Sequence, residues 1–215
     1  MNSTTDAEND RLLHRLLFFT DAVFAIVLTL LVLELRPPES VGVGGLFARL
    51  GDMFGKLLAF VLSFSVVGVF WTAHMLTLRR LARFDWSIAW ANLFYLFPVC
   101  LIPFVSALMG EGAFGGEAWV LYSCDLIGAS SAMVVMWLIA SRDGGRLLSG
   151  LAAGERLYRA LRAASPGLAF GLGLIALHSG MPMISQFCFL FIPLIFVIVE
   201  VLFKPRQRRG PSPTE

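Results

Sequence analysis

Polar side chains inside otherwise apolar stretches are the first residues of this sequence that could do chemistry. Asp21 lies within the apolar run 16–35, His74 lies near the end of a second run, and Asn92 lies in a third. A carboxylate or an imidazole shielded from water needs partners in the protein, or else it belongs to a path for protons or ions. The sequence thus points either to a hydrogen-bonded network that joins helices, or to a proton relay or ion site.

Helical spacing predicts that several polar residues lie at one depth. In the second run, Trp71 and His74 fall on the same helical face, and in the third run Asp85 and Asn92, seven residues apart, also share a face. We expect five residues to meet at one level: Arg15, Asp21, His74, Asp85 and Asn92. We favour a structural network that holds three helices in register, and a proton relay or ion site is the alternative.

The elements that position these residues are predicted from composition. Of 215 residues, 57% are hydrophobic and 15% are charged, and the mean hydropathy is +0.77. A chain this apolar cannot cover a water-exposed surface with charge, so it is expected to cross a membrane several times. An all-α protein of six spans is predicted: Leu16–Leu35, Lys56–Leu76, Ser87–Leu108, Trp119–Ala140, Ser165–Leu177 and Pro182–Phe203.

The fifth predicted span is short and contains Pro166. It is either extended by the amphipathic stretch Glu155–Arg162 or kinked within the bundle. The long apolar runs lack the alternation of a β-strand, which excludes an antiparallel sheet.

Positive charge predicts the orientation, because loops rich in Lys and Arg stay in the cytoplasm. If both termini are cytoplasmic, fourteen of the seventeen Lys and Arg residues lie inside, and Arg36, Arg49 and Lys56 lie outside. We therefore expect a cytoplasmic segment 1–15, a membrane domain 16–203 and a basic cytoplasmic tail 204–215. The tail would touch anionic lipid headgroups.

Several functional classes have no support in the sequence. The net charge is only +2, and the basic residues cluster beside apolar runs, so no nucleic-acid partner is expected. There is no HExxH, no GxSxG and no Cys/His cluster at metal spacing, so neither an enzyme nor a resident metal or other cofactor is expected. Asp125, in the fourth span, is interpreted as a packing residue hydrogen-bonded to Ser123, Ser130 or Ser131.

One face of the first span carries an aliphatic stripe. At 100° per residue, Leu30 and Leu33 each fall within about 40° of Ile26, and Thr29 lies about 60° from Ile26. Asp21 lies about 140° from Ile26, on a different face. The first helix thus combines an aliphatic stripe with a carboxylate that needs a protein partner.

This first span resembles the signature helix of the transmembrane protein 175 family of potassium channels. The resemblance rests on Arg15, on Phe19-Thr20-Asp21-Ala22 where the family has Phe-Ser-Asp-Gly or Phe-Ser-Asp-Ala, and on the runs 23–26 and 29–34. It continues through Leu62-Ser63-Phe64, Val69-Phe70-Trp71, His74 and Asn92, and covers roughly residues 15–140.

The resemblance implies a homotetramer in which four copies of the first helix line a potassium pathway, in the inner membrane of a prokaryote. It implies that Ile26, Leu30 and Leu33 form the narrow part of the pore, with Thr29 beside them in a threonine layer. Thr20 keeps the hydroxyl of the family serine, and Arg15 and Asp21 match the family's polar pair.

The sequence contains no Thr-Val-Gly-Tyr-Gly loop from which a carbonyl filter could be built. A ring of isoleucine or leucine would gate by dewetting instead, with modest selectivity for potassium over sodium. Two alternatives are a proton-coupled or ion-coupled carrier that uses Asp21, His74 and Asp125, and a structural membrane protein without transport.

Overall fold

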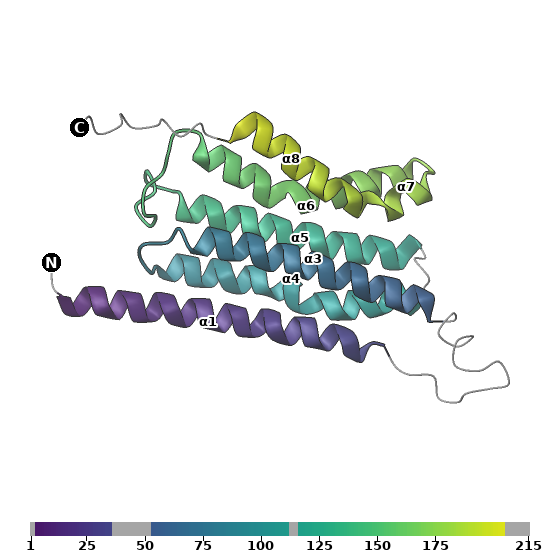
Figure 1. Ribbon diagram of the computed structural model, residues 1–215, viewed down its shortest axis with the longest axis horizontal. Coiled ribbons are helices and arrows are strands. Elements are labelled where there is room, and N and C mark those ends of the chain that lie inside the picture. The colour runs from purple at the N-terminus through teal and green to yellow at the C-terminus, as the bar shows by residue number, and fades with distance from the viewer. Residues whose placement is uncertain (1–2, 36–52, 112–115, 205–215) are drawn as a thin grey trace, which may run out of the picture.

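The computed structural model describes residues 3–35, 53–111 and 116–204, and its regular elements in those ranges are all helical. The long helices run alongside one another in a bundle (Figure 1). Their bounds are α1 Ser3–Leu33, α3 Phe54–Leu78, α4 Trp86–Glu111, α5 Gly116–Ala140 and α6 Glu155–His178, followed by α7 Pro182–Gln186, the 3₁₀ turn η1 Cys188–Leu190 and α8 Phe191–Phe203.

Five of these helices are long and apolar enough to cross a membrane, namely α1, α3, α4, α5 and α6. The prediction of an all-α, multi-pass membrane protein is confirmed. For the fifth span the structure decides between the two alternatives, because α6 begins at Glu155 and includes the amphipathic stretch. The helix α1 begins at Ser3, so the described part of the predicted cytoplasmic segment continues the first span without a break.

The predicted sixth span, Pro182–Phe203, is not one helix. It is divided into α7, η1 and α8, and α8 has only 13 residues. Pro193 lies in the first turn of α8, where its missing N–H is not needed, whereas in a continuous helix its ring would meet the carbonyl of Phe189. The apolar run therefore bends at η1 before α8 continues along α6.

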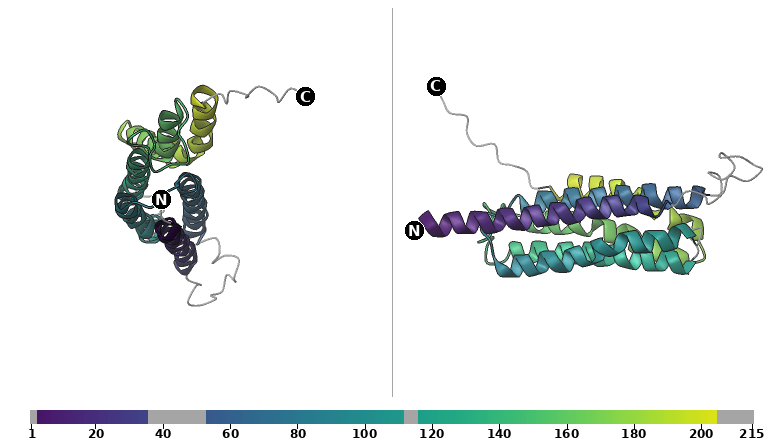
Figure 2. Two further views of the ribbon diagram at one scale, coloured as in Figure 1. Left: turned by 90° about the vertical axis from the view of Figure 1, so that its left-hand side faces the viewer. Right: turned by 90° about the horizontal axis from the view of Figure 1, so that it is seen from below.

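Contacts follow the chain order in most of the bundle. α1 packs on α3 and α4, α4 on α5, and α5 on α6, which also carries α7, η1 and α8. Seen end-on, these helices form an arc, with α3 and α8 facing one another across its open side (Figure 2, left). The N-terminal end of α1 and the C-terminal end of α8 point toward the same end of the bundle (Figure 1).

Two glycines of α6 allow very close approach of its neighbours. A Cβ at Gly167 would lie 2.7 Å from Cβ of Ser130 in α5, and the Gly167 amide donates a 2.8 Å hydrogen bond to the Ser130 hydroxyl. A Cβ at Gly173 would lie 2.8 Å from the sulfur of the buried Cys188. Contacts this short leave no room for a side chain, so α6 is fixed tightly between α5 and η1.

The loops at the arginine-rich end are joined to one another. Leu81 and Leu148 form an isolated antiparallel bridge, and the Ala82 amide donates to the Leu147 carbonyl at 2.8 Å. The Phe84 amide donates to Oδ1 of Asn9, which connects this loop to the first turns of α1. These contacts hold α1, the α3–α4 loop and the α5–α6 loop together at one end.

Candidate functional site

The helix α1 has one buried face and one exposed face. Phe24, Val27 and Leu31 are buried against α3 and α4. The stripe predicted from the sequence lies on the other face, where Ile26 is 57% and Leu33 is 67% exposed. A single copy of the chain leaves this aliphatic face without a protein partner among the described residues.

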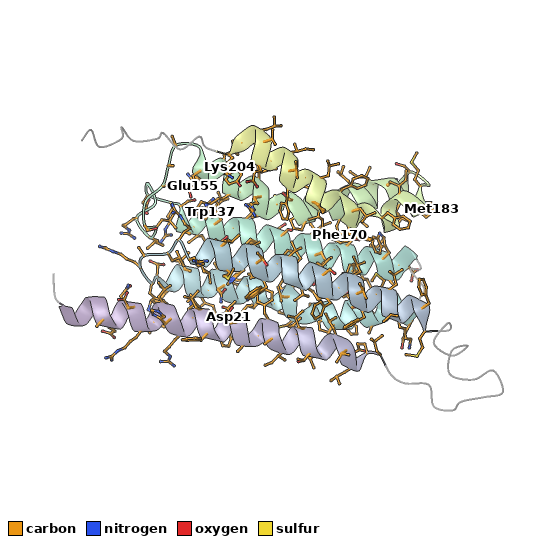
Figure 3. The ribbon with its side chains drawn as sticks, viewed as in Figure 1. Asp21, Trp137, Glu155, Phe170, Met183 and Lys204 are labelled. Atoms are coloured by element: carbon orange, nitrogen blue, oxygen red, sulfur yellow. The ribbon has the colours of Figure 1, made fainter. Side chains whose placement is uncertain are left out.

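The exposed face of α1 also carries polar groups. Thr29 is exposed, and its hydroxyl donates to the Ile26 carbonyl at 2.7 Å. Asp21 is exposed too, and it accepts a 2.9 Å hydrogen bond from the indole N–H of Trp71 in α3. Figure 3 labels Asp21 on the side of α1 that is next to the neighbouring helices. A carboxylate is costly in lipid, so this face suits water or another protein surface better than hydrocarbon.

Behind the exposed face, three polar side chains form a chain of hydrogen bonds. His74 Nε2 lies 2.6 Å from Asn92 Oδ1, Asn92 Nδ2 donates to the Thr20 hydroxyl at 2.8 Å, and Thr20 donates to the Leu16 carbonyl at 2.9 Å. All three side chains are buried. They join α3, α4 and α1 at one level of the bundle.

The direction of these bonds determines what the chain can do. Because the Asn92 amide donates to Thr20, its oxygen is the end that faces His74, so His74 Nε2 must donate. The imidazole also stacks on Tyr95, with ring centres 4.9 Å apart. All the hydrogen bonds run in one direction, and the last acceptor is a backbone carbonyl, which does not pass a proton on. The geometry therefore supports a structural network more than a proton relay.

Two of the five residues predicted to meet are elsewhere. Asp85 precedes α4 and accepts a 2.7 Å hydrogen bond from the Ser87 amide, and its carboxylate lies 3.9 Å from Arg142. Hydrogen bonding from Ser87, supported by the positive charge of Arg142, lowers the pKa of the Asp85 carboxyl. Arg15 is exposed and has no ion pair among the described residues. Helical spacing predicted the depth of both residues, but Asp85 caps the start of α4 and Arg15 is exposed.

The structure also joins residues that the sequence did not single out together. The Ser63 hydroxyl donates to Ser106 at 2.8 Å and lies 3.1 Å from the Tyr122 hydroxyl, which connects α3, α4 and α5. By its spacing in the sequence, Ser63 shares a helical face with Trp71 and His74, but its hydrogen-bond partners lie on other helices. No sequence signal relates the rotation of one helix to that of the next.

Asp125 does not have the serine partners expected for it. Its Oδ2 is buried with no hydrogen-bond partner in the described part of the chain, and the Ser123 hydroxyl is likewise unpaired. Ser130 instead accepts from the Gly167 amide. Within residues 3–35, 53–111 and 116–204, no three His, Cys, Asp or Glu side chains are grouped so that they could hold a metal.

Comparison with known proteins identifies relatives that match part of the chain. A family model described as the endosomal/lysosomal potassium channel TMEM175 matches residues 15–103. A protein named potassium channel from Streptomyces collinus is 32% identical over 130 residues, which are 59% of this chain and 63% of that protein. Another potassium channel, from a Chryseobacterium species, is 34% identical over 131 residues, or 61% of this chain and 66% of that protein.

A solved structure matches more of the fold. The crystal structure of a lysosomal potassium-selective channel TMEM175 homologue from Chamaesiphon minutus covers 87% of this chain and 97% of its own, with a TM-score of 0.69 and 26% identity. The sequence matches to the two bacterial relatives span slightly less than two thirds of their length. The family-model match at residues 15–103 includes α1 from Arg15 onward, α3 and most of α4, which hold the exposed face and the hydrogen-bonded chain.

Proposed function

Since this chain belongs to the TMEM175 family, we propose that it forms a potassium channel in which copies of α1 surround a central pathway. The observation that carries the proposal is the two-faced character of α1. Its inner face is buried on α3 and α4, while Ile26, Leu30 and Leu33 are exposed together with Thr29. Rotational copies of such a helix can enclose a pore, which one copy cannot.

The assembly that we propose is a homotetramer of six-span subunits with both termini in the cytoplasm, in the inner membrane of a prokaryote. The segment α7–η1–α8 would serve as the sixth crossing, because it returns along α6 from the far end of the bundle (Figure 1). The arginine-rich loops at 79–85 and 141–154 would then lie on the cytoplasmic side.

Ion selection in this assembly would depend on side chains. Rings of Ile26, Leu30 and Leu33 would exclude water when narrow and admit partly hydrated ions when wide. An ion that rearranges its hydration shell at low cost would pass more readily, so we propose modest selectivity for potassium over sodium. Thr29, between these rings, would offer hydroxyl oxygens to the passing ion.

The chain of Thr20, Asn92 and His74 would position α1 rather than conduct. It lies on the buried side of the helix, behind the proposed pathway. Asp21 and Trp71 make a separate contact at the edge of the exposed face, where they would fix the rotation of α1 against α3.

The test is flux through purified protein in liposomes, with native mass spectrometry of the same sample. We expect a tetramer that passes potassium faster than sodium, with a reversal potential that follows the potassium gradient. Saturable exchange coupled to protons would support the carrier alternative, and a strictly monomeric active species would overturn the pore formed by α1.

A further inference from the structure

A pocket at the arginine-rich end of the bundle gathers positive charge. It has a volume of about 460 Å³ and lies between the end of α3, the start of α6 and the end of α8. Five cationic side chains line it: Arg79, Arg80, Arg159, Arg162 and Lys204. Figure 3 labels Glu155 and Lys204 at this end of the bundle.

Carboxylates neutralise only part of this charge. Arg80 and Arg159 both pair with Glu155, at 3.2 and 2.7 Å, and Lys204 pairs with Glu200. Five cations against two carboxylates leave an excess of three positive charges around the pocket. Such an excess favours an anionic ligand.

Some of the cationic donors have no acidic partner. Arg79 is exposed and has no ion pair among the described residues. Arg162 donates to the Tyr158 hydroxyl at 3.2 Å and lies over the Phe196 ring, again without an ion pair in that part of the chain. The Nε atom of Arg80 is buried with no hydrogen-bond partner among the described residues. Arginine donors of this kind match the oxygens of a phosphate group.

An apolar groove continues from this pocket along α3. A second pocket, of about 420 Å³, shares Ala73, Leu76 and Arg162 with the first and extends along α3 to Ser65. A third, of about 300 Å³, shares Ser65, Val69 and Phe196 with the second. The groove lies between α3 and α8, on the open side of the arc (Figure 2, left).

The length of the groove fits one leaflet of a bilayer. The residues of α3 that line the second pocket run from Ser65 to Leu76, which at 1.5 Å per residue is about 16 Å. Half of a hydrocarbon core is about 15 Å. An acyl chain could therefore lie in the groove while its headgroup occupies the basic pocket.

We propose that this cleft between α3, α6 and α8 is a binding site for an anionic phospholipid, with the phosphate held by Arg79 and Arg162 and an acyl chain lying along α3 from Leu76 to Ser65. Charge complementarity selects an anionic lipid as the occupant, because the pocket carries an excess of positive charge and the groove that continues from it is apolar. The cleft meets the edge of the exposed face of α1 at Trp71, which lines the second pocket and donates to Asp21. The proposal does not depend on the channel function proposed above.

The experiment uses the purified full chain in detergent and native mass spectrometry. The probes are phosphatidylglycerol, phosphatidylcholine with the same acyl chains, and glycerol phosphate, which supplies the anionic group without the chains. The headgroup variant is Arg79→Gln with Arg162→Gln. Its control is Arg83→Gln with Arg146→Gln, which removes the same charge from exposed residues outside the pocket.

A second variant tests the groove. Gly68 lines it, and a Cβ there would meet nothing within 4 Å, so Gly68→Phe should fill the groove without a backbone clash. Gly128→Phe is the matched control, because Gly128 of α5 also has open space around its Cβ and lies outside the groove.

We expect phosphatidylglycerol to bind more tightly than phosphatidylcholine. The headgroup variant should weaken phosphatidylglycerol binding about 30-fold, because each arginine removed from contact with an anionic lipid costs about fivefold in affinity. Gly68→Phe should weaken phosphatidylglycerol binding and leave glycerol phosphate binding unchanged, and both controls should behave as the original chain.

Equal binding of the two lipids would overturn the proposal. The proposal would also be overturned if glycerol phosphate competed as well as the lipid and Gly68→Phe had no effect, because these two results together would indicate a site for a free phosphate. A change in subunit number on Gly68→Phe without a change in lipid binding would show that a second copy fills the groove, and would also overturn it.

Discussion

The helices α1 and α6 show two opposite ways of holding a membrane helix. α6 is enclosed by α5, α7, η1 and α8, and two of its glycines leave less than 3 Å between a notional Cβ and its neighbours. Within the described ranges, α1 packs mainly on α3 and α4 and has a broad exposed face. It is held instead by the hydrogen bonds of Thr20 and Asp21. α6 is thus enclosed by close packing, whereas α1 is held by one packed face and a few polar contacts, and its other side stays exposed.

The largest expected effect is a steric clash in the close contact between α5 and α6. Gly167→Leu places a side chain where Ser130 Cβ would lie 2.7 Å from the new Cβ, so α5 and α6 must separate. Overpacking of this kind typically costs about 1–3 kcal/mol, and here the close contact with Ser130 places it at the upper end. We expect loss of the folded protein in size-exclusion chromatography or a large fall in its melting temperature. The control Gly171→Leu, on the same helix with open space around Cβ, should melt near the original temperature.

The next effect contrasts the two faces of α1. Val27→Asn buries an amide without a partner against α3 and α4, which costs about 2–3 kcal/mol and should impair assembly. Ile26→Asn puts the same amide on the exposed face, where it should fold normally, raise ion flux and weaken discrimination between potassium and sodium. Liposome flux in matched potassium and sodium gradients, with melting curves, distinguishes them. If Ile26→Asn unfolds the protein while Val27→Asn raises flux, the pathway lies on the other side of α1.

A smaller loss is expected at the polar contacts that hold α1. Asn92→Leu leaves both His74 and Thr20 without their partner, and hydrogen bonds between membrane helices contribute about 1–2 kcal/mol. We expect a lower melting temperature with little change in the ratio of potassium to sodium flux. Asn92→Asp, which keeps an acceptor for His74, should recover part of the stability. Unchanged stability in Asn92→Leu would show that packing alone holds α1.

Asp21 offers a related comparison on the exposed face. Asp21→Ala removes the acceptor of the Trp71 N–H, and Asp21→Asn retains an oxygen that can accept it. We expect Asp21→Ala to lower the stability of the protein by about 1 kcal/mol and Asp21→Asn to lower it less. Melting curves of the two variants provide the measurement. A folded Asp21→Ala protein whose flux acquires a new pH dependence would favour the carrier alternative.

The smallest effect is at the start of α4, outside the membrane. Asp85→Ala removes the helix cap at Ser87, which costs about 1 kcal/mol at neutral pH. Because the folded state lowers the pKa of Asp85 below its usual 3.8, its contribution is complete above pH 3.8 and is lost as the pH falls through the lowered pKa. The difference in melting temperature between the original chain and Asp85→Ala should therefore shrink in strongly acidic buffer. A difference that stays constant down to the lowest pH would show that the cap does not depend on the charge.

Much of the fold could be predicted because membrane helices obey local rules. Apolar runs of about 20 residues predicted α1, α3, α4 and α5 to within a few residues, apart from the longer N-terminal end of α1. The break between α7 and α8 was missed, because hydropathy averages over a run and does not detect a turn placed by Pro193. The predicted tail beyond Lys204, and Arg36 and Arg49, lie outside the described residues.

The polar network shows where prediction from the sequence ends. The sequence determined which residues are costly in a membrane and on which face of its own helix each one lies, because hydropathy and the 3.6-residue period are properties of a single segment. Only the tertiary structure decided that Asn92 joins Thr20 to His74, that Asp85 caps α4 and that Asp125 lacks a serine partner. Those outcomes depend on how far each helix is rotated and shifted against its neighbours. Close packing, such as that of Gly167 on Ser130, sets that rotation, and it involves atoms far apart in the sequence.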